Sequence, residues 1–112
     1  MESLREKQWR FVKMLSQLVA KAEELGYELT LGDAYRDPRL HGKLGVKLGY
    51  GHPKSCHKLR LAQDYNLFKD GEYLPSTSDY LPLGLFWESI GGTWGGRFND
   101  GNHFSLEHEG VK

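Results

Sequence analysis

The apolar and polar positions at the start of the chain predict a long amphipathic helix. Ser3 and Glu6 fit a capping box, in which the two side chains satisfy backbone amides left open at a helix start. Apolar residues then recur at helical spacing as far as Gly26, a residue type that often ends helices. We expect one apolar face that packs on a sheet, and its members are Leu4, Phe11, Val12, Leu15, Leu18, Val19, Ala22 and Leu25.

Shorter patterns predict a small antiparallel sheet. Residues 27–31 alternate apolar and polar side chains, as a half-buried strand does. Residues 59–68 are rich in apolar side chains and end at Asp70-Gly71, a strong hairpin-turn signal, so residues 72–74 are expected to form the return strand. The pattern at residues 104–106 predicts one more short strand. The order of the strands in the sheet does not follow from these patterns.

A second helix is expected between about residues 79 and 90, with Ser78 as its N-cap. Its core-facing positions are Leu83, Phe86, Trp87 and Ile90. The predicted fold class is therefore α+β, a small antiparallel sheet packed by the long N-terminal helix and this second helix.

Between residues 37 and 54 the composition shifts to Gly, Pro, Lys and His, which disfavours regular structure. A loop of this length in a small domain is usually functional or disordered, and we expect a flexible flap over a cleft. His41 and His52 lie in this loop, and we expect both to be exposed to solvent and not to bind metal.

Length, charge and cysteine content exclude several classes of protein. A chain of 112 residues forms one domain, residues 1–112. Its 15 basic and 15 acidic residues balance, so nucleic acid is not an expected partner. One cysteine allows no internal disulfide. The chain has neither an apolar signal core nor an apolar run of membrane-spanning length, so we expect synthesis in the cytoplasm and no membrane insertion. We also expect a monomer.

Four side chains carry the candidate chemistry: His57, Asp64, Asp100 and His103. A catalytic zinc site needs three protein ligands, an open position and a base beside it. His57 and Asp64 are seven residues apart, which on one helix would separate them by roughly 10 Å, too far for ligands of a single ion. We therefore expect a bend between them, with His57 in a loop or first turn and Asp64 on the strand that follows. On residue types alone, a simple turn at Asp100 and two structural histidines remain an alternative.

The spacing Ser55-x-His57-x(4)-Ala62-x-Asp64 followed by Asp100-x-x-His103 resembles the signature of the D-Ala-D-Ala carboxypeptidase and VanY-type zinc peptidases. Trp94-Gly95-Gly96-Arg97-Phe98 resembles the branch of small bacteriophage L-alanyl-D-glutamate endolysins. The family often carries Gly where this chain has Arg60. The resemblance covers about residues 29–106 and implies a Hedgehog/DD-peptidase-like fold.

The resemblance also implies roles for single residues. Zn²⁺ would be held by His57, Asp64 and His103, and Asp100 would act as the general base. Arg36, in a Tyr-Arg pair similar to that of the family, would face the substrate; pairing with Asp33 or Asp37 is the structural alternative. The implied reaction is hydrolysis of peptidoglycan stem peptides at an L-Ala-D-Glu or D-Ala-D-Ala type bond, on the cell wall after release across the membrane.

Two further functions remain open at this point. Cys56 could be the nucleophile of a cysteine peptidase, with His103 as base and Asp100 orienting it, although Asp64 would then have no role. The chain could also be an inactive cell-wall-binding or protein-binding module on the same fold. His108 is not expected to join His103 in a metal site, because strand alternation sends the two rings to opposite faces and leaves His108 at the surface.

Overall fold

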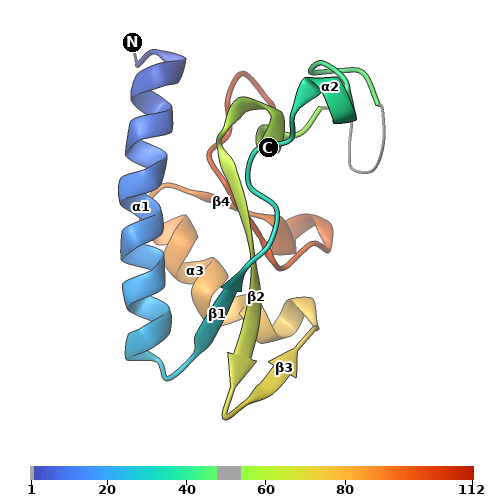
Figure 1. Ribbon diagram of the computed structural model, residues 1–112. Helices are drawn as coiled ribbons and strands as arrows, with labels where there is room; N and C mark the ends of the chain where they lie inside the picture. Colours follow the sequence, from blue (N-terminus) through green and yellow to red (C-terminus); the bar gives the residue numbers. More distant parts are fainter. Residues whose placement is uncertain (1, 48–53) are drawn as a thin grey trace.

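The computed structural model describes residues 2–47 and 54–112 and shows an α+β fold (Figure 1). The helices are α1 (Leu4–Glu24), the short α2 (Pro38–His41) and α3 (Leu81–Ser89), with 3-10 turns η1 (Cys56–Leu59), η2 (Thr77–Tyr80) and η3 (Gly95–Phe98). The strands are β1 (Glu28–Leu31), β2 (Ala62–Lys69), β3 (Glu72–Leu74), β4 (Thr93–Trp94) and β5 (His103–Ser105). The predicted long N-terminal helix, second helix and antiparallel sheet are confirmed.

Strand β2 is the centre of the sheet. Among the described residues the order is β1-β2-β5-β4, and β3 also pairs with β2. Leu67 of β2 lies opposite both Leu29 of β1 and Leu74 of β3, so these two strands lie along opposite edges of β2. Nearer its start, β2 pairs with β5, and this register places Asp64 directly opposite His103. Residues opposite each other in an antiparallel pair point to the same face, so the two side chains are neighbours.

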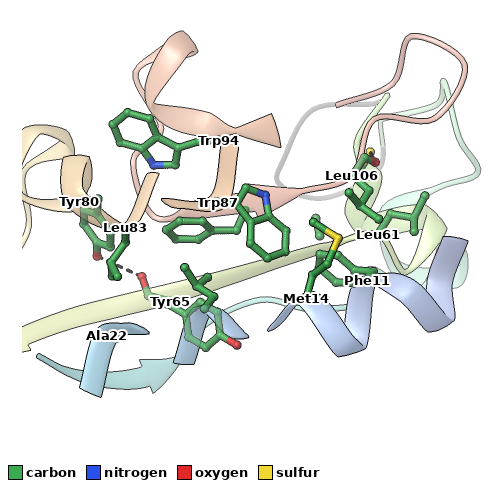
Figure 2. Close-up of a cluster of buried hydrophobic side chains, with 14 of the residues drawn as sticks. Phe11, Met14, Ala22, Leu61, Tyr65, Tyr80, Leu83, Trp87, Trp94 and Leu106 are labelled. Carbon is green, nitrogen blue, oxygen red and sulfur yellow. Dashed lines mark hydrogen bonds between the residues drawn. The ribbon is translucent and has the colours of Figure 1, made fainter. Parts of the chain in front are cut away.

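Aromatic side chains fill the space between the sheet and the two long helices (Figure 2). The Trp87 ring of α3 meets Phe11 of α1 and Phe104 of β5 edge to face, at centroid distances of 5.8 and 6.0 Å. Phe104 also contacts Tyr65 of β2. Residue alternation therefore sends Phe104 into the core and its neighbour His103 to the other face of the sheet.

The apolar face of α1 differs from the predicted one. The capping box of Ser3 and Glu6 forms as expected, but the buried side chains of the helix are Phe11, Met14, Leu18 and Ala22. Val12 is 64% exposed and Val19 43% exposed, so their assignment to the core face was wrong. Each follows a buried position by one residue, and the rotation of about 100° per residue turns it away from the core. Leu25, the C-cap, is also exposed.

The second helix begins later than predicted. Ser76, not Ser78, caps the preceding turn η2 through a capping box with Asp79, and α3 starts at Leu81 with a proline in its first turn. A proline is tolerated there because its missing N–H would have no partner within the helix. Leu83 and Trp87 are buried and Phe86 and Ile90 partly buried, as the pattern indicated.

The loop after β1 is described only in part. Residues 48–53 of the predicted flap, including His52, and the side chain of His41 lie outside the described part of the chain. Before that gap, the chain forms the turn α2, and the ammonium group of Lys58 donates hydrogen bonds to the carbonyls of Val46 and Lys43 at 2.6 and 3.2 Å. No helix within residues 2–47 and 54–112 combines the length and apolar character that crossing a membrane requires.

Gly84 provides a test of the packing between α3 and β4. A Cβ at this position would overlap the indole ring of Trp94. Ala is normally favoured over Gly inside a helix by up to about 1 kcal/mol. We nevertheless expect Gly84→Ala to lower the free energy of unfolding by about 1–3 kcal/mol, because the added methyl overpacks the contact.

Urea unfolding followed by fluorescence measures this effect. Leu85→Ala is the matched control, since Leu85 is the next residue of the helix and is 48% exposed. This substitution should change the free energy of unfolding by no more than about 0.5 kcal/mol. A Gly84→Ala protein as stable as the parent would contradict this packing.

Candidate metal centre

Three side chains from separate elements converge on the face of the sheet opposite Phe104. His57 lies in η1, Asp64 in β2 and His103 in β5. One potential ligand atom of each lies within 4.8 Å of the other two, and both histidines are buried. The chain bends between His57 and Asp64, as their spacing required. Among the described residues, this group of His, Cys, Asp and Glu side chains is the one that can hold a metal ion.

The hydrogen bonds of His57 leave a lone pair directed at Asp64. Its Nδ1 lies 2.6 Å from the carbonyl oxygen of Ala34, which can only accept, so Nδ1 carries the proton. In a neutral imidazole Nε2 is then an acceptor, yet it lies 3.1 Å from Oδ1 of Asp64, a second acceptor. Two acceptors at this distance need a cation or a proton between them. The carbonyl behind the ring fixes the tautomer in the way that metal-binding histidines commonly require.

His103 approaches the same carboxylate oxygen from the neighbouring strand. Its Nδ1 lies 3.4 Å from Oδ1 of Asp64, whereas its Nε2 is buried and has no hydrogen-bond partner among the described residues. The rings of His57 and His103 meet edge to face with centroids 5.1 Å apart. Each ring thus presents one nitrogen to the space beside Asp64.

The spacing of these atoms suits a small divalent cation. Ligand atoms about 2.1 Å from a tetrahedral zinc ion lie about 3.4 Å from one another. The observed separations of 3.1 and 3.4 Å from Oδ1 of Asp64 are close to that value. Two imidazole nitrogens and one carboxylate are a donor set that zinc accepts, with one position of the tetrahedron left open.

Asp64 is ionised in this setting. Burial alone would raise its pKa, but its interactions with the rings of His103 and His57 outweigh burial and lower the pKa to about 2. The backbone of Asp64 is clamped to the chain after β1: its N–H donates to the carbonyl of Asp33 and its carbonyl accepts from Gly32, both at 2.8 Å. A Cβ on Gly32 would lie 3.0 Å from that of Asp64, so a small residue allows this close approach.

Asp100 lies on a tight turn between η3 and His103. Its N–H donates to the carbonyl of Gly95 at 2.8 Å, and its own carbonyl accepts from the N–H of His103 at 3.1 Å. A Cβ on Gly95 would overlap the Asp100 carbonyl and lie 2.6 Å from the Cβ of His103, so only glycine fits there. Asp100 itself is exposed. Desolvation of its carboxyl raises its pKa, and the negative charge of Asp64 adds to the rise.

Arg36 makes the pairing with Asp33 that was the structural alternative for it. Its guanidinium is paired with Asp33, Nη2 to Oδ2 at 3.5 Å, and Nη1 donates to Oγ of Ser55 at 3.2 Å. Its backbone N–H donates to the carbonyl of His57 at 3.1 Å. Arg36 is therefore anchored beside the histidine and still borders the cleft described next.

A cleft of about 660 Å³ opens over the three converging side chains. Its lining includes His57 and His103 together with Arg36, Ser55, Phe98 and Asp100. Phe98 is 47% exposed, and its ring contacts that of His103 with centroids 5.7 Å apart. The structure thus brings all five predicted site residues to one place, three as a buried cluster and two on the walls above it.

Comparisons of the chain with models of known protein families and with curated proteins find no match.

Arg60 stands at a position where the zinc peptidases that the spacing pattern resembles often carry glycine. It adopts a left-handed conformation with φ of 58° at the end of η1, a conformation that favours glycine. Its N–H donates to carbonyls of η1, and its guanidinium stacks over the ring of Tyr35 at 4.0 Å. This cation–π contact offsets part of the backbone strain, and the turn that carries His57 keeps its shape.

Ser55 is a site residue whose role the sequence pattern did not reveal. Its hydroxyl accepts hydrogen bonds from the N–H of His57, as the cap of η1, and from Arg36. The serine therefore fixes the position of both. The Ala34 carbonyl that orients His57 was also missed, because a backbone atom leaves no signal in residue identity.

Cys56 and His108 lie outside the metal cluster. The Cys56 thiol is fully buried, donates to the carbonyls of Val111 and Leu106, and has a pKa that burial raises to about 12. His108 is half-buried, so its assignment to the surface was wrong. Its Nδ1 lies 3.2 Å from the ammonium group of Lys7, and its backbone pairs with Val111.

Proposed function

We propose that this chain is a zinc-dependent peptidase that hydrolyses peptidoglycan stem peptides, of the kind found in small bacteriophage endolysins. The observation that carries the proposal is the buried convergence of His57, Asp64 and His103 beneath an open cleft that also presents Asp100. A purely structural cluster would not require a further carboxylate in the cleft that opens over it. The resemblance to D-Ala-D-Ala carboxypeptidases and VanY-type peptidases supplies the substrate class and the Hedgehog/DD-peptidase-like fold.

Each residue of the site then has a chemical task. Zinc would supply a Lewis acid that activates water and polarises the amide carbonyl. Asp100, a carboxylate that lines the cleft, accepts the proton of the attacking water. Arg36 donates hydrogen bonds to the oxyanion that develops on the carbonyl or to a carboxylate of the peptide. Asp33 and Ser55 hold that guanidinium in place.

The cysteine peptidase alternative is disfavoured by the surroundings of Cys56. A nucleophilic cysteine needs a thiolate that substrate can reach. The Cys56 thiol is instead buried, with a pKa raised to about 12, and it hydrogen-bonds two backbone carbonyls far along the chain. We assign it to holding the C-terminal segment against η1. An inactive binding module would keep the zinc but show no turnover, so activity decides that alternative.

Digestion of purified cell wall followed by mass spectrometry of the released muropeptides tests the function. We expect peptides cut within the stem, between L-Ala and D-Glu, with D-Ala-D-Ala cleavage as the alternative bond. A thiol reagent should leave this activity in place because Cys56 is buried. Glycan fragments that carry intact stem peptides would contradict the peptidase proposal.

A further inference from the structure

The turn that carries Asp100 is held by two side chains from outside it. Gly101, the next residue, is buried, and its N–H donates a hydrogen bond to the hydroxyl of Thr77 at 3.1 Å. Its carbonyl accepts a hydrogen bond from the indole N–H of Trp94 at 2.8 Å. Trp94 belongs to β4, whereas Thr77 belongs to η2 and lies 24 residues earlier in the chain than Gly101.

These contacts fix the peptide groups on both sides of the Asp100 side chain. The carbonyl of Asp100 and the N–H of Gly101 belong to one peptide group. The carbonyl accepts from the N–H of His103 at 3.1 Å, and the N–H donates to Thr77. The preceding peptide group is held by the hydrogen bond from the N–H of Asp100 to the carbonyl of Gly95. Because peptide groups are planar, these partners set the direction in which the Asp100 side chain leaves the backbone.

Gly101 and Thr77 are packed closely enough that the hydroxyl has no easy substitute. A Cβ on Gly101 would lie 2.6 Å from the Cα of Thr77 and 3.0 Å from its carbonyl oxygen. The hydrogen bond between them is partly buried. A side chain of the same shape without a hydroxyl would therefore leave the N–H of Gly101 against an apolar group, which is unfavourable for a polar group removed from water.

Thr77 is itself tied to β2, the strand that contributes the carboxylate of the metal cluster. It begins η2, and Tyr80 ends this turn. The buried hydroxyl of Tyr80 donates to the carbonyl of Tyr65 at 3.0 Å and accepts from the N–H of Leu67 at 3.2 Å, and both partners lie in β2. Thr77 is thus a link between the central strand and the turn that follows η3.

We propose that Thr77 is a positioning residue for Asp100, whose carboxylate it directs into the cleft by holding the peptide group that follows. The catalytic consequence rests on the proposed peptidase function, in which Asp100 is the base. A general base must lie within hydrogen-bonding distance of the proton it takes, and a misplacement of about 1 Å can cost about 10²-fold in rate. Thr77 is not among the described residues that line the cleft, so it acts through Asp100.

Two substitutions at Thr77 test this role. Thr77→Val removes the hydroxyl and keeps the branched shape, whereas Thr77→Ser keeps the hydroxyl. With a purified stem peptide, the zinc-loaded Thr77→Val protein should have a kcat about 10-fold below that of the parent, with KM and zinc affinity retained. Thr77→Ser should restore kcat to near the parent value. Ser78→Ala is the matched control, because it removes a hydroxyl from the next, exposed residue of η2 and should leave kcat unchanged.

A double-mutant cycle separates positioning from a general loss of structure. In the Asp100→Asn protein the base is already absent, so adding Thr77→Val should lower kcat no further. A further drop of about 10-fold in that background would assign the effect of Thr77→Val to something other than Asp100 and would overturn the proposal. A normal kcat for Thr77→Val, measured beside an active parent, would overturn it as well.

Amide hydrogen exchange of the metal-free protein, followed by NMR, tests the anchoring without any need for activity. The N–H of Gly101 should exchange about 10-fold faster in Thr77→Val than in the parent or in Thr77→Ser, because the turn opens locally. Unchanged exchange at Gly101, or an equal acceleration at the buried Leu18 of α1, would overturn the proposal. A parent that cleaves no stem peptide would reject the peptidase function, while faster exchange confined to the turn would still support Thr77 as its anchor.

Discussion

Asp100→Asn should lower the rate of cell-wall peptide hydrolysis by about 10²- to 10⁴-fold, the usual contribution of a positioned proton acceptor. Asn has nearly the same shape but cannot take the proton. The turn at residue 100 is held by backbone hydrogen bonds to Gly95 and His103, which Asn keeps. Zinc content, measured by atomic spectroscopy, and melting temperature should therefore stay close to those of the parent.

Asp70→Asn is the matched control for this variant. Asp70 is an exposed carboxylate in the β2–β3 turn with φ of 51°, a conformation that Asn tolerates well. Its substitution should leave activity unchanged. Near-normal turnover of Asp100→Asn would show that the base lies elsewhere, and loss of zinc in this variant would make Asp100 a ligand.

His57→Ala should lose both zinc and activity. A site with three protein ligands that loses one keeps too few to hold the ion, and even the loss of a residue that only supports a ligand typically weakens metal affinity by about 10- to 100-fold. We expect a reduction in zinc affinity larger than that, measured by competition with a chromophoric chelator. The rise in melting temperature that zinc gives to the parent should disappear as well, since a ligand stabilises the folded state only when its free concentration exceeds its Kd for that state.

His108→Ala tests whether this effect is specific to the cluster. His108 is half-buried like a structural histidine but lies beside Lys7 and Val111 and not beside Asp64. The zinc affinity of the His108→Ala protein should match that of the parent. Stoichiometric zinc in His57→Ala would mean that the ligand set is a different one.

Much of the fold could be predicted from local sequence signals. The capping box at Ser3 and Glu6 marked the start of α1, and the Asp70-Gly71 pair marked the β2–β3 hairpin. The rotation of α1 about its axis was less accessible, because Val12 and Val19 are as apolar as the buried residues. The burial of Phe11, Met14, Leu18 and Ala22, and the contact of Phe11 with Trp87 of α3, show which face meets the core.

In the candidate site, too, some features could be predicted from the sequence and others could not. The seven-residue gap between His57 and Asp64 already required a bend in the chain, and the structure has one at η1 and Arg60. The pairing of Asp64 with His103 could not be predicted, since it depends on the register of β2 and β5, which are far apart in the sequence. The contact of the C-terminal segment with η1 was also beyond prediction, because the N–H of Cys56 meets the carbonyl of Lys112 only in the folded chain.

The most direct test of the central claim is cleavage of a purified stem peptide by the chain before and after metal exchange. Protein stripped by a chelator should leave the peptide intact over hours. One equivalent of zinc should restore cleavage, seen in the mass spectrum as two fragments that together account for the peptide plus one water. Equal cleavage by the stripped and the zinc-loaded protein, or an intact peptide under both conditions, would contradict a zinc-dependent peptidase built on His57, Asp64 and His103.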